Sequence, residues 1–153
     1  MKKLFVFVLL AIMLLAGSVS AETITGRQAE EVLKATFPNS ISLGINWADR
    51  FVGVTEDQAW DILTGSALSG NEPYTNRYVP GVYKCGNFAK DSVACIRNSI
   101  RGAAVFTMAI PGINHSIVAF ITPDKKVMVL EPQNTNLNLR VGDYVEKVAI
   151  IRN

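Results

Sequence analysis

The pattern that most constrains the fold lies in the second half of the chain, where helical spacing changes to strand spacing at Gly102. From Cys85 to Ile100, apolar and small residues recur at steps of three and four, which is the spacing of one buried helix face. Beyond Gly102, turns that begin at Pro111 and Pro123 separate segments with strand character. The expected strands cover residues 103–110, 115–121, 127–130 and 144–151. This order predicts an α+β domain in which N-terminal helices pack on an antiparallel β-meander.

Two capping boxes predict helices in the first half of the chain. Residues 25–28 read Thr-Gly-Arg-Gln and precede a helical apolar pattern over residues 29–37, which Pro38 ends. Residues 55–58 read Thr-Glu-Asp-Gln, with acidic residues where the helix dipole favours them, and the helix that they open is expected to end near Gly65.

The remainder of the first half is less regular. Residues 41–45 alternate as a strand does, and Trp47 and Phe51 are expected to be anchors of the core. Residues 66–81 have no periodicity and predict a long surface loop. Loops of this length are often functional, so this one is a candidate wall of a substrate cleft, with a plain connector as the alternative.

The first 21 residues are typical of a signal peptide. Lys2 and Lys3 give a basic start, the apolar run over residues 4–16 follows, and small residues lead to Ala21. A membrane-spanning helix wants roughly 20 apolar residues, so this shorter run favours cleavage, with an uncleaved anchor as the alternative. We therefore expect a single domain over residues 22–153 that is secreted or periplasmic.

The charge of the expected mature chain is balanced. Without Lys2 and Lys3, 13 basic residues face 13 acidic ones, which gives no electrostatic reason to expect nucleic acid or an anionic membrane as partner. The expected partner is instead a peptide, a protein or cell-wall peptide. No stable membrane span is expected once the signal peptide is removed, and the oligomeric state stays open.

The two cysteines are expected to remain unpaired. Cys85 and Cys95 lie ten residues apart on the predicted helix, which separates their Cα atoms by about 15 Å at 1.5 Å rise per residue. A disulfide needs a separation below about 7 Å. A bridge that replaces the helix is the alternative.

Three residues in the second half have the chemistry of an activated nucleophile. Cys85 lies at a helix start, where unpaired N–H groups stabilise a thiolate. The only histidine, His115, begins a predicted strand and would exchange a proton with the thiol. Counting across the turn at Pro123 makes Glu131 the first candidate to orient the imidazole, with Gln133 and Asn134 behind it.

The motifs around these residues resemble those of the papain-like and transglutaminase-like cysteine hydrolases. The closest resemblance is to the papain-like domain at the C-terminus of certain fungal agglutinins and its bacterial, archaeal and phage relatives. It covers roughly residues 45–151 and depends on Tyr83-x-Cys85-x-x-Phe88-Ala89, on His115, and on Glu131-Pro132-Gln133. The resemblance implies a nucleophilic Cys85, an acid–base His115 and an orienting Glu131.

The sequence departs from that family pattern in two places. Some relatives use calcium to order the site, but Gly86 and Asn87 stand where acidic residues are common, so no cofactor is expected and calcium is implied by resemblance alone. No glutamine stands at the usual oxyanion position before the cysteine. Asn76, Tyr78 or the backbone N–H of Cys85 remain the candidate oxyanion donors.

These observations predict an exported cysteine-dependent hydrolase, a peptidase or amidase with a Cys-His-Glu triad. Two alternatives stay open. One is a transglutaminase-like acyl transferase. The other is a catalytically inactive exported binding domain with the same fold, which the missing glutamine and the missing acidic residues favour.

Overall fold

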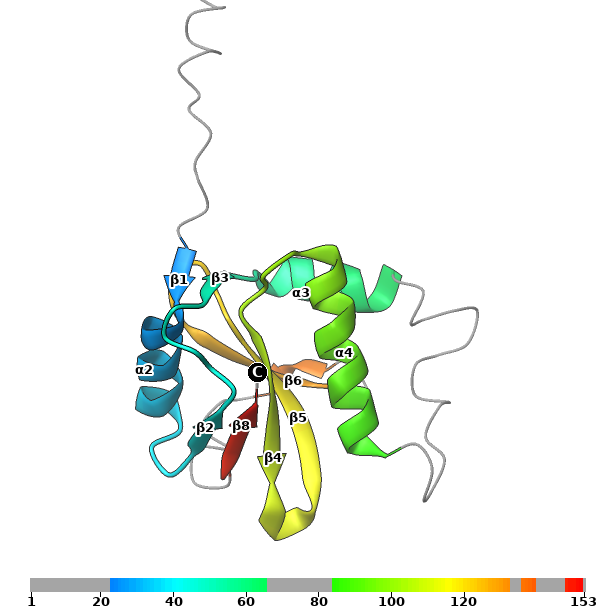
Figure 1. Ribbon diagram of the computed structural model, residues 1–153. Coiled ribbons are helices and arrows are strands. Elements are labelled where there is room, and N and C mark those ends of the chain that lie inside the picture. Colours follow the sequence, from blue (N-terminus) through cyan, green and yellow to red (C-terminus); the bar gives the residue numbers. More distant parts are fainter. Residues whose placement is uncertain (1–22, 66–83, 133–135, 140–147, 153) are drawn as a thin grey trace, which may run out of the picture.

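The computed structural model describes residues 23–65, 84–132, 136–139 and 148–152 (Figure 1). Strands and helices alternate in the first half, and strands follow one long helix in the second. In chain order the elements are β1 (Thr23–Thr25), α2 (Gly26–Thr36), β2 (Ile41–Leu43), β3 (Arg50–Val52), α3 (Glu56–Gly65), α4 (Cys85–Ser99), β4 (Val105–Ile110), η2 (Pro111–Ile113), β5 (His115–Ile121), β6 (Val127–Glu131), β7 (Asn136–Leu139) and β8 (Ile150–Arg152).

Six of the strands form one mixed sheet in the order β2-β8-β4-β5-β6-β7. Strands β4 to β7 pair antiparallel with their chain neighbours, as the hairpin turns predict. The last strand, β8, returns to the other side of β4, and β2 adds to it in parallel. The predicted fold, an antiparallel meander on N-terminal helices, is therefore wrong for the sheet as a whole, because β8 pairs with β4 instead of its chain neighbour and β2 joins the sheet in parallel.

Helices cover both faces of this sheet (Figure 1). On one face, α2 packs through Ala29 and Leu33 against strand residues such as Phe106 and Ile117. On the other face, α3 and α4 pack against residues such as Val118 and Phe120. Phe88 of α4 is fully buried, and such burial stabilises a fold by roughly 1.5–3 kcal/mol per side chain. The burial of α4 fixes its first residue beside the end of the sheet.

The predicted helix starts are confirmed by their caps. In the Thr25–Gln28 box, the Gln28 N–H donates to Thr25 Oγ1 at 3.2 Å and the Thr25 N–H donates to Gln28 Oε1 at 2.9 Å. The Thr55–Gln58 box makes the same two bonds, at 3.2 and 3.0 Å. Each box satisfies N–H groups that the first turn of a helix leaves without an intrahelical partner.

Two core predictions have different outcomes. Phe51 is buried and packs edge-on against Phe106, with ring centroids 5.5 Å apart. Trp47 is 63% exposed, so its expected place in the core is wrong. Instead, the loop that carries Trp47 is hydrogen-bonded to the first residue of α2, where the Gly26 N–H donates to the Asp49 carbonyl oxygen. This attachment directs the indole away from the core.

Several predictions lie outside the described residues. They are the signal peptide over residues 1–21, the loop over 66–81, the oxyanion candidates Asn76 and Tyr78, the orienting candidates Gln133 and Asn134, and the part of the last predicted strand over residues 144–147. Across the described ranges, no helix has the length and apolar character needed to cross a membrane.

Candidate functional site: a thiol, an imidazole and a carboxylate

Cys85 is the first residue of α4, as the sequence predicted. Lys84 precedes it in an extended conformation and donates its backbone N–H to Asn87 Oδ1 at 3.1 Å, which closes the first turn. The Cys85 side chain is partly buried. The thiol therefore lies at the N-terminus of α4, where the first N–H groups of the helix have no intrahelical partner.

His115 is positioned by the hairpin between β4 and β5. Its backbone pairs with Ile110 across the hairpin, and the η2 turn joins the two residues. Asn114 completes that turn in the left-handed conformation, with φ of 50° and ψ of 49°, which Asn tolerates better than most residues. This turn brings the imidazole to the first position of β5, at the end of the sheet that faces Cys85.

Glu131 reaches the same place from the last residue of β6. Val118 pairs with Leu130, so the register continues to bring Glu131 level with Ile117, two residues along the same face from His115. The two side chains meet there, with His115 Nε2 2.6 Å from Glu131 Oε2. Counting across the turn therefore identified the imidazole's partner correctly.

The Cys85 thiol closes the row on the other side of the imidazole. Its S–H donates to the Asn114 carbonyl oxygen at 3.7 Å, and the thiol also interacts with the His115 ring. Nε2 of the ring faces Glu131. The structure thus brings Cys85, His115 and Glu131 together in the order thiol, imidazole, carboxylate.

The electrostatics of the row favour a protonated imidazole. The hydrogen bond that the imidazole donates to the Glu131 carboxylate is the largest influence and raises the pKa of His115. Burial acts in the opposite direction, and the Cys85 thiol adds a smaller upward contribution to the pKa. The His115 and Glu131 side chains are only 20% and 13% exposed, so solvent screens this pair weakly.

The two cysteines are free, and the predicted absence of a bridge between them is confirmed. Both lie on α4, as the separation argument required. The row therefore contains a reduced sulfur.

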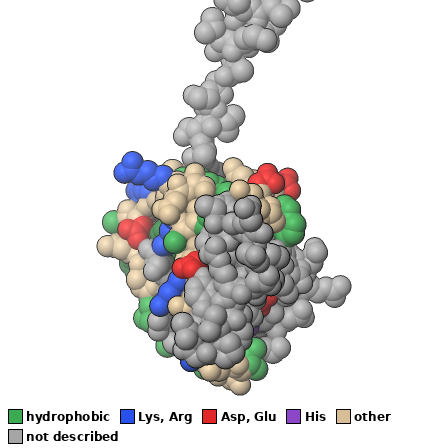
Figure 2. Space-filling model, turned by 90° about the vertical axis from the view of Figure 1, so that its right-hand side faces the viewer, with side chains coloured by type: hydrophobic (Ala, Val, Ile, Leu, Met, Phe, Trp, Pro, Cys, Tyr) green, Lys and Arg blue, Asp and Glu red, His purple; other side chains and the backbone are tan. Residues whose placement is uncertain are grey.

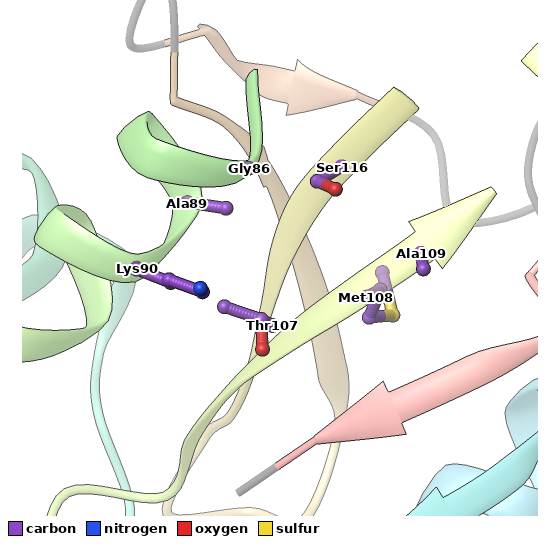
Figure 3. Close-up of a pocket in the computed structure, with 7 residues that line it drawn as sticks. All are labelled: Gly86, Ala89, Lys90, Thr107, Met108, Ala109 and Ser116. Carbon is purple, nitrogen blue, oxygen red and sulfur yellow. The ribbon is translucent and has the colours of Figure 1, made fainter. Parts of the chain in front are cut away.

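The described residues also line a cavity of about 120 Å³ (Figure 3). It lies between α4 and the β4–β5 hairpin and is lined by Gly86, Ala89, Lys90, Thr107, Met108, Ala109 and Ser116. Gly86 and Ser116 are the chain neighbours of Cys85 and His115, and neither reactive residue lines the cavity itself. In Figure 3, the Ala89, Lys90 and Ser116 side chains extend into the space between the elements. The arrangement can hold a small group of a ligand whose other part contacts the thiol.

Sequence reasoning missed the cavity residues Ser116 and Lys90. Alternation along β5 puts Ser116 on the face opposite His115, where it lies near α4: a Cβ added to Gly86 would be 3.7 Å from Ser116 Oγ. The sequence did contain one signal of the cavity. Gly86 and Ala89 lie three residues apart on α4, and two small residues on one helix face leave space between the helix and the sheet.

The described residues contain no group of three or more His, Cys, Asp or Glu side chains arranged to hold a metal ion. Charges of both signs appear on the side of the molecule that carries α3 and α4, and neither sign dominates the described surface in Figure 2. On this side, the described residues therefore form no electropositive surface that would bind an anionic polymer.

No protein-family model matches the chain, and no curated protein matches it. Two similar solved structures are described as the PSL1a-E64 complex and as Polyporus squamosus lectin bound to the human-type influenza-binding epitope Neu5Aca2-6Galb1-4GlcNAc. The first has a TM-score of 0.62 and 20% identity over 86% of this chain and 50% of that chain. The second has a TM-score of 0.60 and 21% identity over 86% and 49%. The protein thus shares a fold with part of each of these two structures. It spans about half the length of each of them.

These comparisons contradict the assignment made from the sequence motifs. The similar structures are those of a lectin, and neither description names a papain-like or transglutaminase-like cysteine hydrolase. The papain-like fold class and the main functional prediction, a Cys-His-Glu hydrolase, are corrected accordingly. The bound molecules that the descriptions name are E64 and a saccharide epitope, and neither is a nucleic acid.

Proposed function

We propose that this chain is an exported binding domain whose ligand lies over Cys85 and His115 and extends into the adjoining cavity. The observation that carries the proposal is the contact of His115 with the half-buried Glu131 carboxylate near the partly exposed Cys85 thiol, with a cavity lined by the chain neighbours Gly86 and Ser116. A ligand there would meet a hydrogen-bonding row at one end and small, mostly apolar side chains at the other, which is the usual make-up of a small-molecule site.

The similar structures suggest the ligand with which to begin. One of them is described as a complex with E64, and we propose that this chain also binds E64, at Cys85. No cofactor belongs to the proposal. Export follows from the signal-peptide pattern over residues 1–21, and the domain would comprise residues 22–153.

The test uses a Cys95→Ser protein, in which Cys85 is the single thiol. Prior incubation with E64 should protect Cys85 from iodoacetamide, as measured by intact-protein mass. Cys85→Ser is the matched control, because it should show neither labelling nor a change in thermal midpoint with E64. Full labelling of Cys85 in the presence of excess E64 would overturn the choice of ligand. A thiol that iodoacetamide does not reach in the native protein would overturn the site.

A second candidate function is acyl transfer, which the position of His115 between thiol and carboxylate favours. The Cys85 thiolate would attack an acyl donor, form a thioester and release the leaving group with a proton from His115. An amine acceptor would then take the acyl group and restore the thiol. A thioester adduct in the intact mass that an added amine removes would support this candidate, whereas binding without an adduct supports the first.

A further inference from the structure

Trp47 is an exposed aromatic side chain whose position the core does not explain. It lies in the segment between β2 and β3 and is 63% exposed. A buried Trp contributes more apolar area than any other side chain, so an indole on the surface gives up a large stabilisation. A residue that breaks a general rule of folding, as an exposed tryptophan does, often has a functional role.

The segment that carries Trp47 is held firmly. Asp49 receives the Gly26 N–H on its carbonyl oxygen at 2.9 Å, and its own N–H donates to the Asn46 carbonyl oxygen at 2.9 Å. The Asn46 and Asp49 side chains accept two more backbone N–H groups, those of Ala48 and Asn46, at 3.0 and 3.2 Å. The indole is therefore displayed from a preorganised loop, which lowers the entropy lost on binding.

The orientation of the ring is also fixed. The Trp47 indole N–H donates to Glu30 Oε2 at 2.6 Å, and Lys34 holds the other oxygen of that carboxylate at 2.9 Å. The Arg27 guanidinium lies 5.8 Å from the ring centroid, in reach of a cation–π contact, and forms an ion pair with Glu31 at 2.8 Å. Glu30 and Arg27 thus contact the ring, and Lys34 and Glu31 form the ion pairs that hold these two residues.

We propose that Trp47 and its polar rim, formed by Arg27, Glu30, Glu31 and Lys34, bind a neutral saccharide. A sugar ring presents C–H groups on one face, which pack on an aromatic ring, and hydroxyl groups around its edge, which exchange hydrogen bonds with donors and acceptors of this kind. The four rim charges cancel, so the surface attracts neither a polyanion nor an anionic membrane. A protein partner is the competing occupant and is an outcome of the test.

This surface is separate from the thiol row. Trp47 is attached to α2, and Cys85 begins α4, on the other face of the sheet (Figure 1). The inference therefore does not rest on the proposed function of the Cys85 site, and the two fail independently.

The experiment titrates the protein with chitotetraose and N-acetyllactosamine and follows tryptophan fluorescence and saturation-transfer NMR. Wild-type protein, Cys85→Ser and Trp60→Ala should bind alike; Trp60 is the matched control because it is also exposed, at 45%. Trp47→Ala should bind at least about tenfold more weakly, as loss of an anchoring aromatic does, while its thermal midpoint shows that it is folded. Trp47→Phe should recover part of the affinity because it retains an aromatic face.

Equal binding by Trp47→Ala and wild-type protein would overturn the proposal, as would the absence of saturation transfer from the protein to either saccharide at millimolar concentration. Concentration-dependent self-association that Trp47→Ala abolishes, without saccharide binding, would assign the surface to a protein partner and overturn the saccharide proposal as well.

Discussion

Replacement of Gly26 by Ala should destabilise the protein, even though alanine is the better helix former. Gly26 is the first residue of α2, and a Cβ there would lie 1.8 Å from the Asn46 carbonyl oxygen and 3.1 Å from Trp47 Cα. An ordinary contact starts near 3.4 Å, so the loop or the helix must retreat by about 1.6 Å (3.4 minus 1.8). Neither side is a flexible side chain, so the backbone itself must move.

The size of the effect follows from the contacts that such a movement breaks. Overpacking of this kind costs about 1–3 kcal/mol. Displacement of the Asn46 oxygen also strains its bond from the Asp49 N–H, and loss of a backbone hydrogen bond costs about 0.5–1.5 kcal/mol. The gain from replacing glycine in a helix offsets roughly 0.5–1 kcal/mol. We expect a net loss of about 1–3.5 kcal/mol in the free energy of unfolding.

Urea unfolding followed by far-UV circular dichroism measures this loss without depending on the nearby indole. Gly65→Ala is the matched control, because an added Cβ there meets no atom within 4 Å, and its free energy of unfolding should change by less than about 0.5 kcal/mol. The Trp47 emission should shift in Gly26→Ala alone. If the two variants have equal stability and unchanged emission, the close approach of helix and loop is not a constraint, and the preorganised loop loses its support.

Four further predictions concern the row of reactive groups and its scaffold. Glu131→Gln should lower the pKa of His115, since its largest upward influence is lost while burial still lowers the pKa; NMR titration of the single imidazole measures this, with Glu30→Gln as the unaffected control. Because the folded-state pKa of His115 is raised, the ion pair stabilises the fold fully below the ordinary pKa of about 6.5. This contribution to the free energy of unfolding disappears as pH rises through the folded-state pKa. A free energy of unfolding that stays constant across this pH range would contradict the ion pair. Phe88→Ala should lower the free energy of unfolding by about 3–5 kcal/mol in urea titrations because the side chain is fully buried, and a loss under about 1 kcal/mol would mean that α4 is loosely packed. Dialysis against EDTA should leave the thermal midpoint and the E64 protection unchanged, and a loss that added calcium reverses would reveal a structural metal.

Much of the local structure was predictable because short-range rules decide it. The capping boxes at Thr25 and Thr55 fix two helix starts within four residues of sequence. The Pro111 turn and the turn after Ile121 set the length of the hairpins, and hairpin length decides which side chains meet across them. The contact between His115 and Glu131 is a result of that counting.

Long-range arrangement could not be read in the same way. The pairing of β2 with β8 joins residues near opposite ends of the chain, and no local pattern of Ile41 to Leu43 specifies it. The exposure of Trp47 depends on how closely Gly26 approaches Asn46. The cavity depends on small residues of α4 that face β4 only after both have packed. Family motifs also did not decide function, since the similar solved structures are those of a lectin.

The three reactive groups do not share one cooperative unit of structure. The imidazole and the carboxylate belong to adjoining strands that backbone hydrogen bonds tie together, whereas the sulfur arrives with a helix held mainly by side-chain packing. Local opening of that helix would carry the sulfur away and leave the ion pair assembled. The lifetime of the assembled row therefore depends on how often α4 opens, which hydrogen exchange of its backbone amides would report.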